Sequence, residues 1–99
     1  MELYIFARFR VREGQELPAA KVLAEQVGAA RSEPGCLAIG AFRSTRDPLL
    51  FFIHSRWADE AAFEIHAELP HTVRFLALVE PLIDHPLEVT RTLRLDAGL

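Results

Sequence analysis

The chain has 99 residues, of which 51% are hydrophobic, and it carries a formal net charge of −3 with acidic and basic residues interspersed. This length fits a single domain over residues 1–99, and the absence of a basic block or stripe argues against nucleic acid as a partner. The apolar runs are too short to cross a membrane, the first residues do not resemble a signal peptide, and Cys36 has no second cysteine to pair with, so we expect a cytoplasmic protein.

The first part of the chain predicts a strand, a helix and a second strand. Residues 3–11 alternate between two faces, which is the two-residue period of a β-strand. Residues 16–33 carry an apolar stripe at three- and four-residue steps, which predicts a helix that the Pro34-Gly35 pair ends. Residues 36–43 are mostly small and apolar and form the next predicted strand. The stripe of the predicted helix consists of Ala20, Leu23, Val27 and Ala30.

A hairpin and a second helix are predicted to follow. Residues 45–48 have the composition of a turn, so residues 49–57 are expected to form a strand antiparallel to the preceding one. Asp59 is a suitable N-cap for a helix that runs to Leu69 and ends at Pro70. One face of that helix is predicted to hold Ala62, Ile65, His66 and Leu69.

The C-terminal part predicts a short helix and a fourth strand. Thr72 is a candidate cap for a helix through Val79 that Pro81 closes. Residues 87–95 alternate again as a strand, and residues 96–99 are expected to form a loose tail. The resulting β-α-β-β-α-(α)-β order predicts an α+β, ferredoxin-like split βαβ fold, with helices on one face of a four-stranded antiparallel sheet.

The face of this sheet that the helices leave uncovered is not polar. Along the first and third strands, both alternating rows are apolar over half their length. A monomer would expose one of these rows as a large patch, so we expect a homodimer in which two sheets pack face to face. The alternative is that loops cap the strand ends. The row expected to be uncovered contains Tyr4, Phe6, Leu50 and Phe52.

The most informative stretch is residues 51–71. It combines an aromatic strand that ends in Trp57, an acidic helix start, His66 near the helix end and a Pro-His turn. With the Glu-Pro-Gly-Cys turn inside residues 32–37, this pattern resembles the antibiotic biosynthesis monooxygenase family over residues 3–92. The resemblance implies a dimeric α+β barrel. It also implies a family whose members include cofactor-independent monooxygenases of phenols, anthrones and quinols, haem-degrading enzymes and sugar-phosphate isomerases.

Some branches of this family fit the sequence less well. Haem-degrading members carry Asn, Trp and His at positions that match Ala7, His66 and Leu76 here, so haem is not expected. Many members have Glu at the position of Ser55. The expected function is oxidation of a small quinol or hydroxylated aromatic substrate by O₂ without a cofactor. The rivals are an isomerase or other proton-transfer enzyme on the same scaffold, and a non-catalytic ligand-binding or stress-response protein.

Two histidines are the predicted catalytic residues. His66 lies on the apolar face of its helix, and an imidazole can accept a proton near neutral pH. The alternative for His66 is a partly buried side chain bonded to the backbone. His71 either orients His66, borders the pocket or acts as a capping or surface residue. Their spacing of five residues crosses a helix break and no acidic residue or cysteine completes a ligand set, so no metal is expected.

Aromatic and charged side chains complete the predicted site as substrate-binding residues. Trp57, Phe63 and Phe75 could stack on an aromatic substrate, and core packing is the alternative for all three. Arg91 interrupts the apolar row of residues 87–95, so its charge needs a partner or solvent. It could bind a substrate oxyanion or form a salt bridge between subunits.

Overall fold

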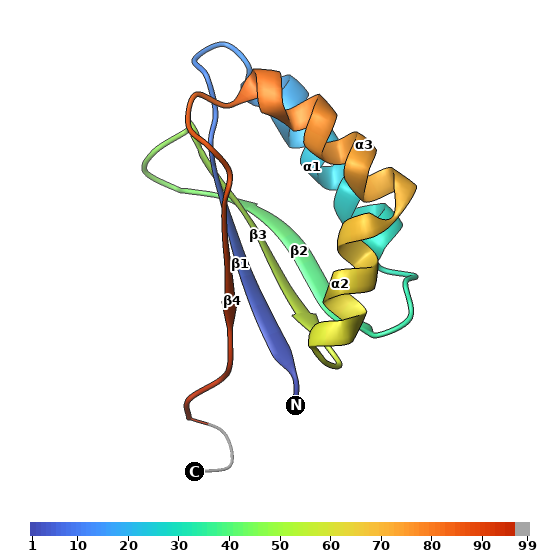
Figure 1. Cartoon of the computed structure of the whole chain (residues 1–99). Coiled ribbons are helices and arrows are strands. Elements are labelled where there is room, and N and C mark those ends of the chain that lie inside the picture. Colours follow the sequence, from blue (N-terminus) through green and yellow to red (C-terminus); the bar gives the residue numbers. More distant parts are fainter. Residues whose placement is uncertain (97–99) are drawn as a thin grey trace.

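The computed structural model describes residues 1–96, which form one antiparallel four-stranded sheet with all three α-helices on one of its faces (Figure 1). This confirms the predicted α+β, ferredoxin-like fold. The expected C-terminal tail lies mostly outside the described residues. No helix in the described part of the chain has the length and apolar character of a membrane span. The elements are β1 (Leu3–Arg10), α1 (Glu16–Ala30), β2 (Cys36–Arg43), β3 (Leu50–Trp57), α2 (Glu60–Glu68), α3 (Pro70–Val79), the 3₁₀ turn η1 (Glu80–Leu82) and β4 (Glu88–Thr92).

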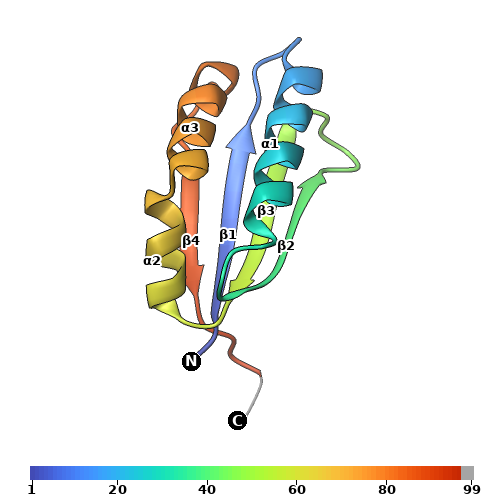
Figure 2. The same ribbon diagram turned by 90° about the vertical axis from the view of Figure 1, so that its right-hand side faces the viewer.

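The sheet has the strand order β2-β3-β1-β4, and every neighbouring pair is antiparallel. Ile5 in the central strand β1 stands opposite Ser55 of β3 on one side and Arg91 of β4 on the other. Figure 2, turned so that the helices face the viewer, shows α1 beside α2 and α3, with the sheet behind them. The inward rows of β1 and β3 pack against these helices and form the core. The largest fully buried side chains are Trp57, Phe9, Leu23, Val11 and Val79.

Helix α1 differs in two ways from its sequence prediction. It ends at Ala30 rather than at residue 33, because residues 31–35 turn back toward the sheet. Its buried stripe contains Ala19 rather than Ala20, and it also buries Gln26. The burial of a polar side chain follows from its contact with Thr72, to which the Gln26 amide donates a hydrogen bond at 3.2 Å.

The break between α2 and α3 also differs from the prediction. Asp59 caps α2 as expected, accepting a hydrogen bond from the Ala62 amide at 2.8 Å. Pro70, however, is the first residue of α3, a position where its missing N–H costs nothing. Thr72 therefore lies inside α3 and is not its cap; its hydroxyl is engaged by Gln26.

The predicted buried face of α2 and the predicted length of β4 are both larger than in the structure. Ile65 is exposed, so the buried side of α2 is centred on His66 and does not include the whole predicted face. Strand β4 covers only Glu88–Thr92 of the predicted residues 87–95. The last residue of β4, Thr92, pairs with Tyr4 of β1. Because β1 itself begins only one residue before Tyr4, the last residues of the predicted strand have no pairing partner in β1.

No described element covers the sheet face opposite the helices (Figures 1 and 2). Phe6 on β1 is 52% exposed and Phe42 on β2 is 55% exposed. His54 of β3 stacks on Phe6 with ring centroids 4.7 Å apart. A single chain thus presents aromatic side chains to solvent on this face, as the sequence indicated, while the dimer itself stays a prediction.

Candidate active site

A cavity of about 260 Å³ lies in the core between the sheet and helices α2 and α3. Most of its wall is apolar, and its polar groups are Gln26, Ser55, His66 and Thr72. A larger depression of about 520 Å³ near Arg12 is open and rimmed by the charged residues Glu80 and Asp84. The apolar cavity is the better candidate site because it combines apolar walls with a few convergent polar groups. Its apolar wall includes Ala7, Ile53, Phe63, Phe75, Leu76 and Val89.

His66 is the buried histidine at the wall of this cavity. Its ring lies on Trp57, with centroids 4.6 Å apart, and 5.6 Å from the ring centroid of Phe63. Trp57 is itself fully buried and donates its indole N–H to Ser55 Oγ at 2.9 Å. The His66 ring is therefore held on an aromatic support whose own polar atom is satisfied.

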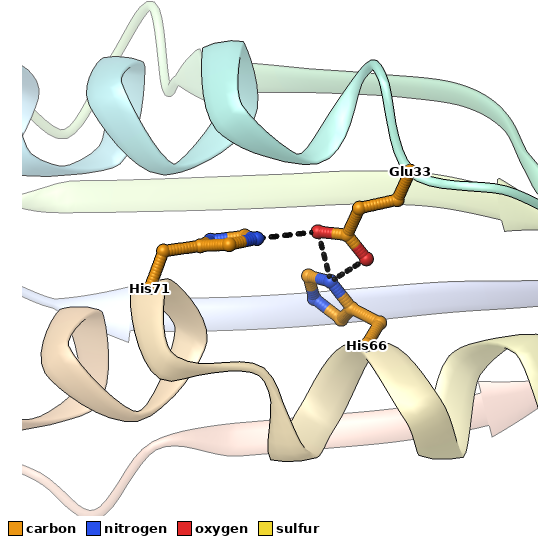
Figure 3. Close-up of side chains that lie close together, drawn as sticks. All are labelled: Glu33, His66 and His71. Atoms are coloured by element: carbon orange, nitrogen blue, oxygen red, sulfur yellow. Dashed lines mark hydrogen bonds and ion pairs between the residues drawn. The ribbon is translucent and has the colours of Figure 1, made fainter.

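Glu33 reaches His66 from the turn after α1 (Figure 3). The Nδ1 atom of His66 lies 2.8 and 2.9 Å from the two carboxylate oxygens of Glu33. A carboxylate accepts hydrogen bonds, so Nδ1 is the nitrogen that carries the proton in this contact. The second ring nitrogen, Nε2, is then left as the acceptor of the neutral imidazole.

His71 approaches the same carboxylate from the first turn of α3 (Figure 3). Its Nε2 atom is buried and lies 2.7 Å from Glu33 Oε2, within ion-pair distance. The other ring nitrogen, Nδ1, lies 3.1 Å from Gln26 Oε1. The side chains of Glu33, His66 and His71 are 8%, 9% and 23% exposed, so the cluster is mostly shielded from water.

The cluster overturns the expectation that no acidic residue completes a ligand set with the two histidines. Donor atoms of Glu33, His66 and His71 all lie within 4.8 Å of one another. Sequence reasoning missed Glu33 as a site residue, although it stands in the Glu-Pro-Gly-Cys turn that supported the family resemblance. The cause is sequence distance, since Glu33 and His66 are 33 residues apart and meet only when the turn packs on α2.

Gly35 explains how the turn comes so close to α2. Its φ of +85° is a left-handed conformation that favours glycine. A Cβ atom at this position would lie 2.6 Å from the Cβ of Ala62, so only a glycine allows this approach. The backbone that follows β3 is also hydrogen-bonded to this turn, since the Ala58 amide donates to the Gly35 carbonyl at 2.8 Å.

The predicted aromatic residues divide into two groups. Phe63 and Phe75 line the cavity together with His66. Trp57 does not line it; this side chain packs with Leu3 and Ile5 behind His66. His71 likewise stands outside the cavity wall and contacts the site through Glu33.

Arg91 finds its partners within the chain. Its guanidinium lies 2.9 Å from Glu60 and 3.3 Å from Glu64, both on α2, and 5.1 Å from the centroid of Phe63. Hydrogen bonds to Glu60 and then to Glu64 raise the pKa of Arg91 above its usual value. The charge is therefore matched at an exposed position outside the cavity wall, which explains how an arginine occupies this strand.

Cys36 has the properties of a small apolar residue. Burial, followed by the negative charge of Glu33, raises the pKa of its thiol. A raised pKa leaves little thiolate at neutral pH, and the thiolate is the reactive form of cysteine. Cys36 is therefore a poor nucleophile, and we assign it to packing against Trp57.

Comparison with known proteins gives one family and a set of similar folds. The family model described as "Antibiotic biosynthesis monooxygenase" matches residues 3–78. Rv0793 from Mycobacterium tuberculosis has a TM-score of 0.92 and 23% identity, with 100% of each chain covered. PA3566 from Pseudomonas aeruginosa has a TM-score of 0.87 and 28% identity, covering 95% of this chain and 94% of that one. A crystal structure named antibiotic biosynthesis monooxygenase has a TM-score of 0.88 and 26% identity, with coverages of 94% and 98%.

No curated protein sequence matches the chain significantly.

Proposed function

This chain belongs to the antibiotic biosynthesis monooxygenase family, and from that premise we propose that it is a cofactor-independent monooxygenase of quinols or hydroxylated aromatic compounds. The observation that carries the proposal is the Glu33–His66 pair at the wall of an apolar cavity. Oxygenation without a cofactor needs a substrate that becomes electron-rich on deprotonation. The protein must then supply a base, a dry pocket and positioning.

His66 is the base in this proposal. Glu33 accepts a hydrogen bond from Nδ1–H of His66 and so favours the tautomer whose free Nε2 can accept a proton from a substrate hydroxyl. The negative carboxylate also stabilises the imidazolium that forms. Contact with Trp57 and Phe63 limits rotation of the ring, which keeps Nε2 in one direction. Glu33 is a positioning residue, because it acts through His66.

The cavity suits a small substrate with few polar groups. Its volume of about 260 Å³ lies just below the usual range for ligand pockets, which indicates a small aromatic molecule of one or two rings. Phe63 and Phe75 are the side chains available for stacking or edge contacts with such a ring. Trp57, His71 and Arg91 are proposed to act indirectly, by supporting His66, Glu33 and Phe63 from outside the cavity wall.

The electrons for the reaction come from the substrate. Proton transfer to His66 gives a phenolate-type anion, which passes one electron to O₂. Recombination of the two radicals forms a carbon–oxygen bond in a peroxide. The O–O bond then breaks, one oxygen stays on the oxidised product as a carbonyl, and the other leaves as water with two protons. The sum is one substrate and one O₂ converted to one ketone or quinone product and one water.

The test is oxygen uptake with a panel of reduced naphthoquinols and hydroxylated aromatics. We expect uptake above the autoxidation rate, and we expect His66→Ala to lower turnover by roughly 10²- to 10⁴-fold, the usual contribution of a general base. His85→Ala is the control, since His85 is exposed and pairs with Asp84 away from the cavity.

Three results would contradict the assigned function or the role of His66. Turnover of His66→Ala within a few-fold of the wild type would refute the base. Proton exchange on a carbonyl substrate without oxygen uptake would instead support an isomerase. Retention of an aromatic ligand without any turnover would support a binding protein.

A further inference from the structure

We propose that Glu33, His66 and His71 form a binding site for one divalent transition-metal ion. The three side chains come from three separate segments, the turn after α1, helix α2 and helix α3, and converge on one point (Figure 3). Their donor atoms lie within 4.8 Å of one another. The inference goes beyond the proposed oxygenation, which requires no metal.

The donor set selects a class of ion. Two imidazole nitrogens and one carboxylate are the protein ligands of many zinc sites with an open position, and of non-haem iron sites. Magnesium and calcium prefer oxygen ligands and are disfavoured by two imidazoles. The site therefore favours a divalent transition-metal ion over Mg²⁺ and Ca²⁺, and Co²⁺ and Zn²⁺ are suitable probes of it.

His71 presents a second imidazole nitrogen to the same carboxylate. Its buried Nε2 atom lies 2.7 Å from Glu33 Oε2, so this contact, like that of His66 Nδ1, pairs a ring nitrogen with a carboxylate oxygen. A metal ion replaces the proton in such a contact, because a ring nitrogen that gives up its proton has a lone pair for coordination.

Gln26 supplies the support that a metal-binding histidine normally has. Its Oε1 atom lies 3.1 Å from Nδ1 of His71, and its amide nitrogen donates to Thr72. A histidine ligand commonly donates its second ring N–H to such an oxygen, which leaves the first nitrogen free to coordinate. The buried Gln26–Thr72 pair therefore orients His71 with Nε2 toward Glu33.

The charge of the cluster also favours a cation. In the described part of the chain, the Glu33 carboxylate forms ion pairs with His66 and His71 and with no lysine or arginine. A buried carboxylate needs compensation of its charge, and a divalent ion would provide it. The present nitrogen–oxygen contacts of 2.7–2.9 Å are hydrogen-bond distances, and ligands of a tetrahedral ion stand about 3.3 Å apart, so each of these contacts would widen by roughly 0.5 Å around a metal.

The ion would occupy the place of the proton on His66 Nδ1. With a metal on Nδ1, the proton of the neutral ring moves to Nε2, and His66 can no longer act as the base of the proposed reaction. We therefore expect Zn²⁺ to lower turnover and chelation to restore it. Metal binding and substrate turnover are measured separately, so failure of the metal-site proposal does not refute the proposed monooxygenase function, or the reverse.

The experiment is a titration of chelator-treated protein with Co²⁺, followed by visible absorption, and with Zn²⁺, followed by calorimetry. We expect one ion per chain, an intense Co²⁺ spectrum typical of low coordination, a Zn²⁺-dependent rise in melting temperature and no binding of Mg²⁺. His71→Ala and Glu33→Gln should each weaken binding by at least roughly 10- to 100-fold, and His85→Ala should bind as the wild type does.

The proposal is overturned if the wild-type protein binds neither ion, or if His71→Ala binds with unchanged affinity. Since removal of a buried side chain can unfold a protein, circular dichroism of each variant is compared with that of the wild type. X-ray absorption of the wild-type Co²⁺ complex gives a second measurement that needs no variant. Nitrogen and oxygen ligands support the site, while a sulfur ligand would place the ion at Cys36 and refute it.

Discussion

At the scale of single residues, the role of Glu33 decides what His66 can do. The two carboxylate oxygens lie at nearly equal distances from Nδ1, so the imidazole is held in one orientation and one tautomer. Without this contact, the His66 ring would have only its aromatic neighbours to fix it, and they do not distinguish the two nitrogens.

Glu33→Gln tests this role directly. An amide can donate a hydrogen bond to Nδ1, which favours the tautomer with the proton on Nε2, the nitrogen that must accept the substrate proton. We expect kcat to fall by roughly 10²- to 10⁴-fold at a nearly unchanged KM, with partial recovery in Glu33→Asp. Glu25→Gln, an exposed change on α1, is the matched control. Steady-state oxygen uptake measures both constants, and a wild-type kcat in Glu33→Gln would contradict the assignment.

At the scale of elements, the turn between α1 and β2 is the segment that builds the site. It places Glu33 beside α2 because Gly35 permits backbone contact with Ala62. The cap of α2 by Asp59 fixes the start of the same helix, so its next two turns carry His66 to a defined position. Two local signals, a glycine turn and an N-cap, thereby set the distance between two remote side chains.

The comparison of Gly35→Ala with Gly14→Ala isolates this packing contribution. Both glycines have a positive φ, of +85° and +87°, so alanine at either position costs about 1–2 kcal/mol of backbone strain. Only at Gly35 would the new Cβ clash, 2.6 Å from the Cβ of Ala62, whereas nothing lies within 4 Å at Gly14. We expect Gly35→Ala to lose about 1–3 kcal/mol more unfolding free energy than Gly14→Ala.

Urea unfolding of the two variants measures this difference. Equal losses would show that the turn does not pack tightly on α2. A larger loss in Gly35→Ala with reduced turnover would connect the same contact to the position of Glu33.

At the scale of the whole molecule, the open face of the sheet is an apolar surface that no described element covers (Figures 1 and 2). Its exposed aromatic residues, Phe6 and Phe42, stand on different strands of one continuous sheet, with His54 stacked on Phe6. The helices cover only the other face, so folding of one chain does not bury this surface. These observations support the proposal of a homodimer formed through the sheet faces.

Phe6→Glu tests the dimer. The substitution places a charge among apolar side chains if the faces meet, and its desolvation would be unfavourable. We expect the wild-type protein to sediment as a dimer at micromolar concentration and Phe6→Glu to sediment as a monomer. Ile65→Glu, the same kind of change on the exposed side of α2, should remain dimeric. A wild-type monomer would contradict the proposal.

The sequence by itself determined the elements, their order and the fold. Hydrophobic periodicity, proline and glycine turns and the Asp59 cap are signals between near neighbours, and they predicted the sheet of four strands with its helices. Some errors lay at ends, as in α1, α3 and β4, where a strand or helix stops because a remote partner is missing or another hydrogen bond is available. Others concerned the buried face of a helix, as with Ala20 and Ile65.

Only the tertiary structure decided which polar residues meet. It brought Glu33 to His66 and His71, removed Trp57 from the cavity wall and paired Arg91 with α2. Each of these outcomes depends on the packing of elements that lie far apart in the chain. Periodicity shows which face of an element is buried, but it carries no information on what lies opposite that face, and the chemistry of this site arises from such contacts.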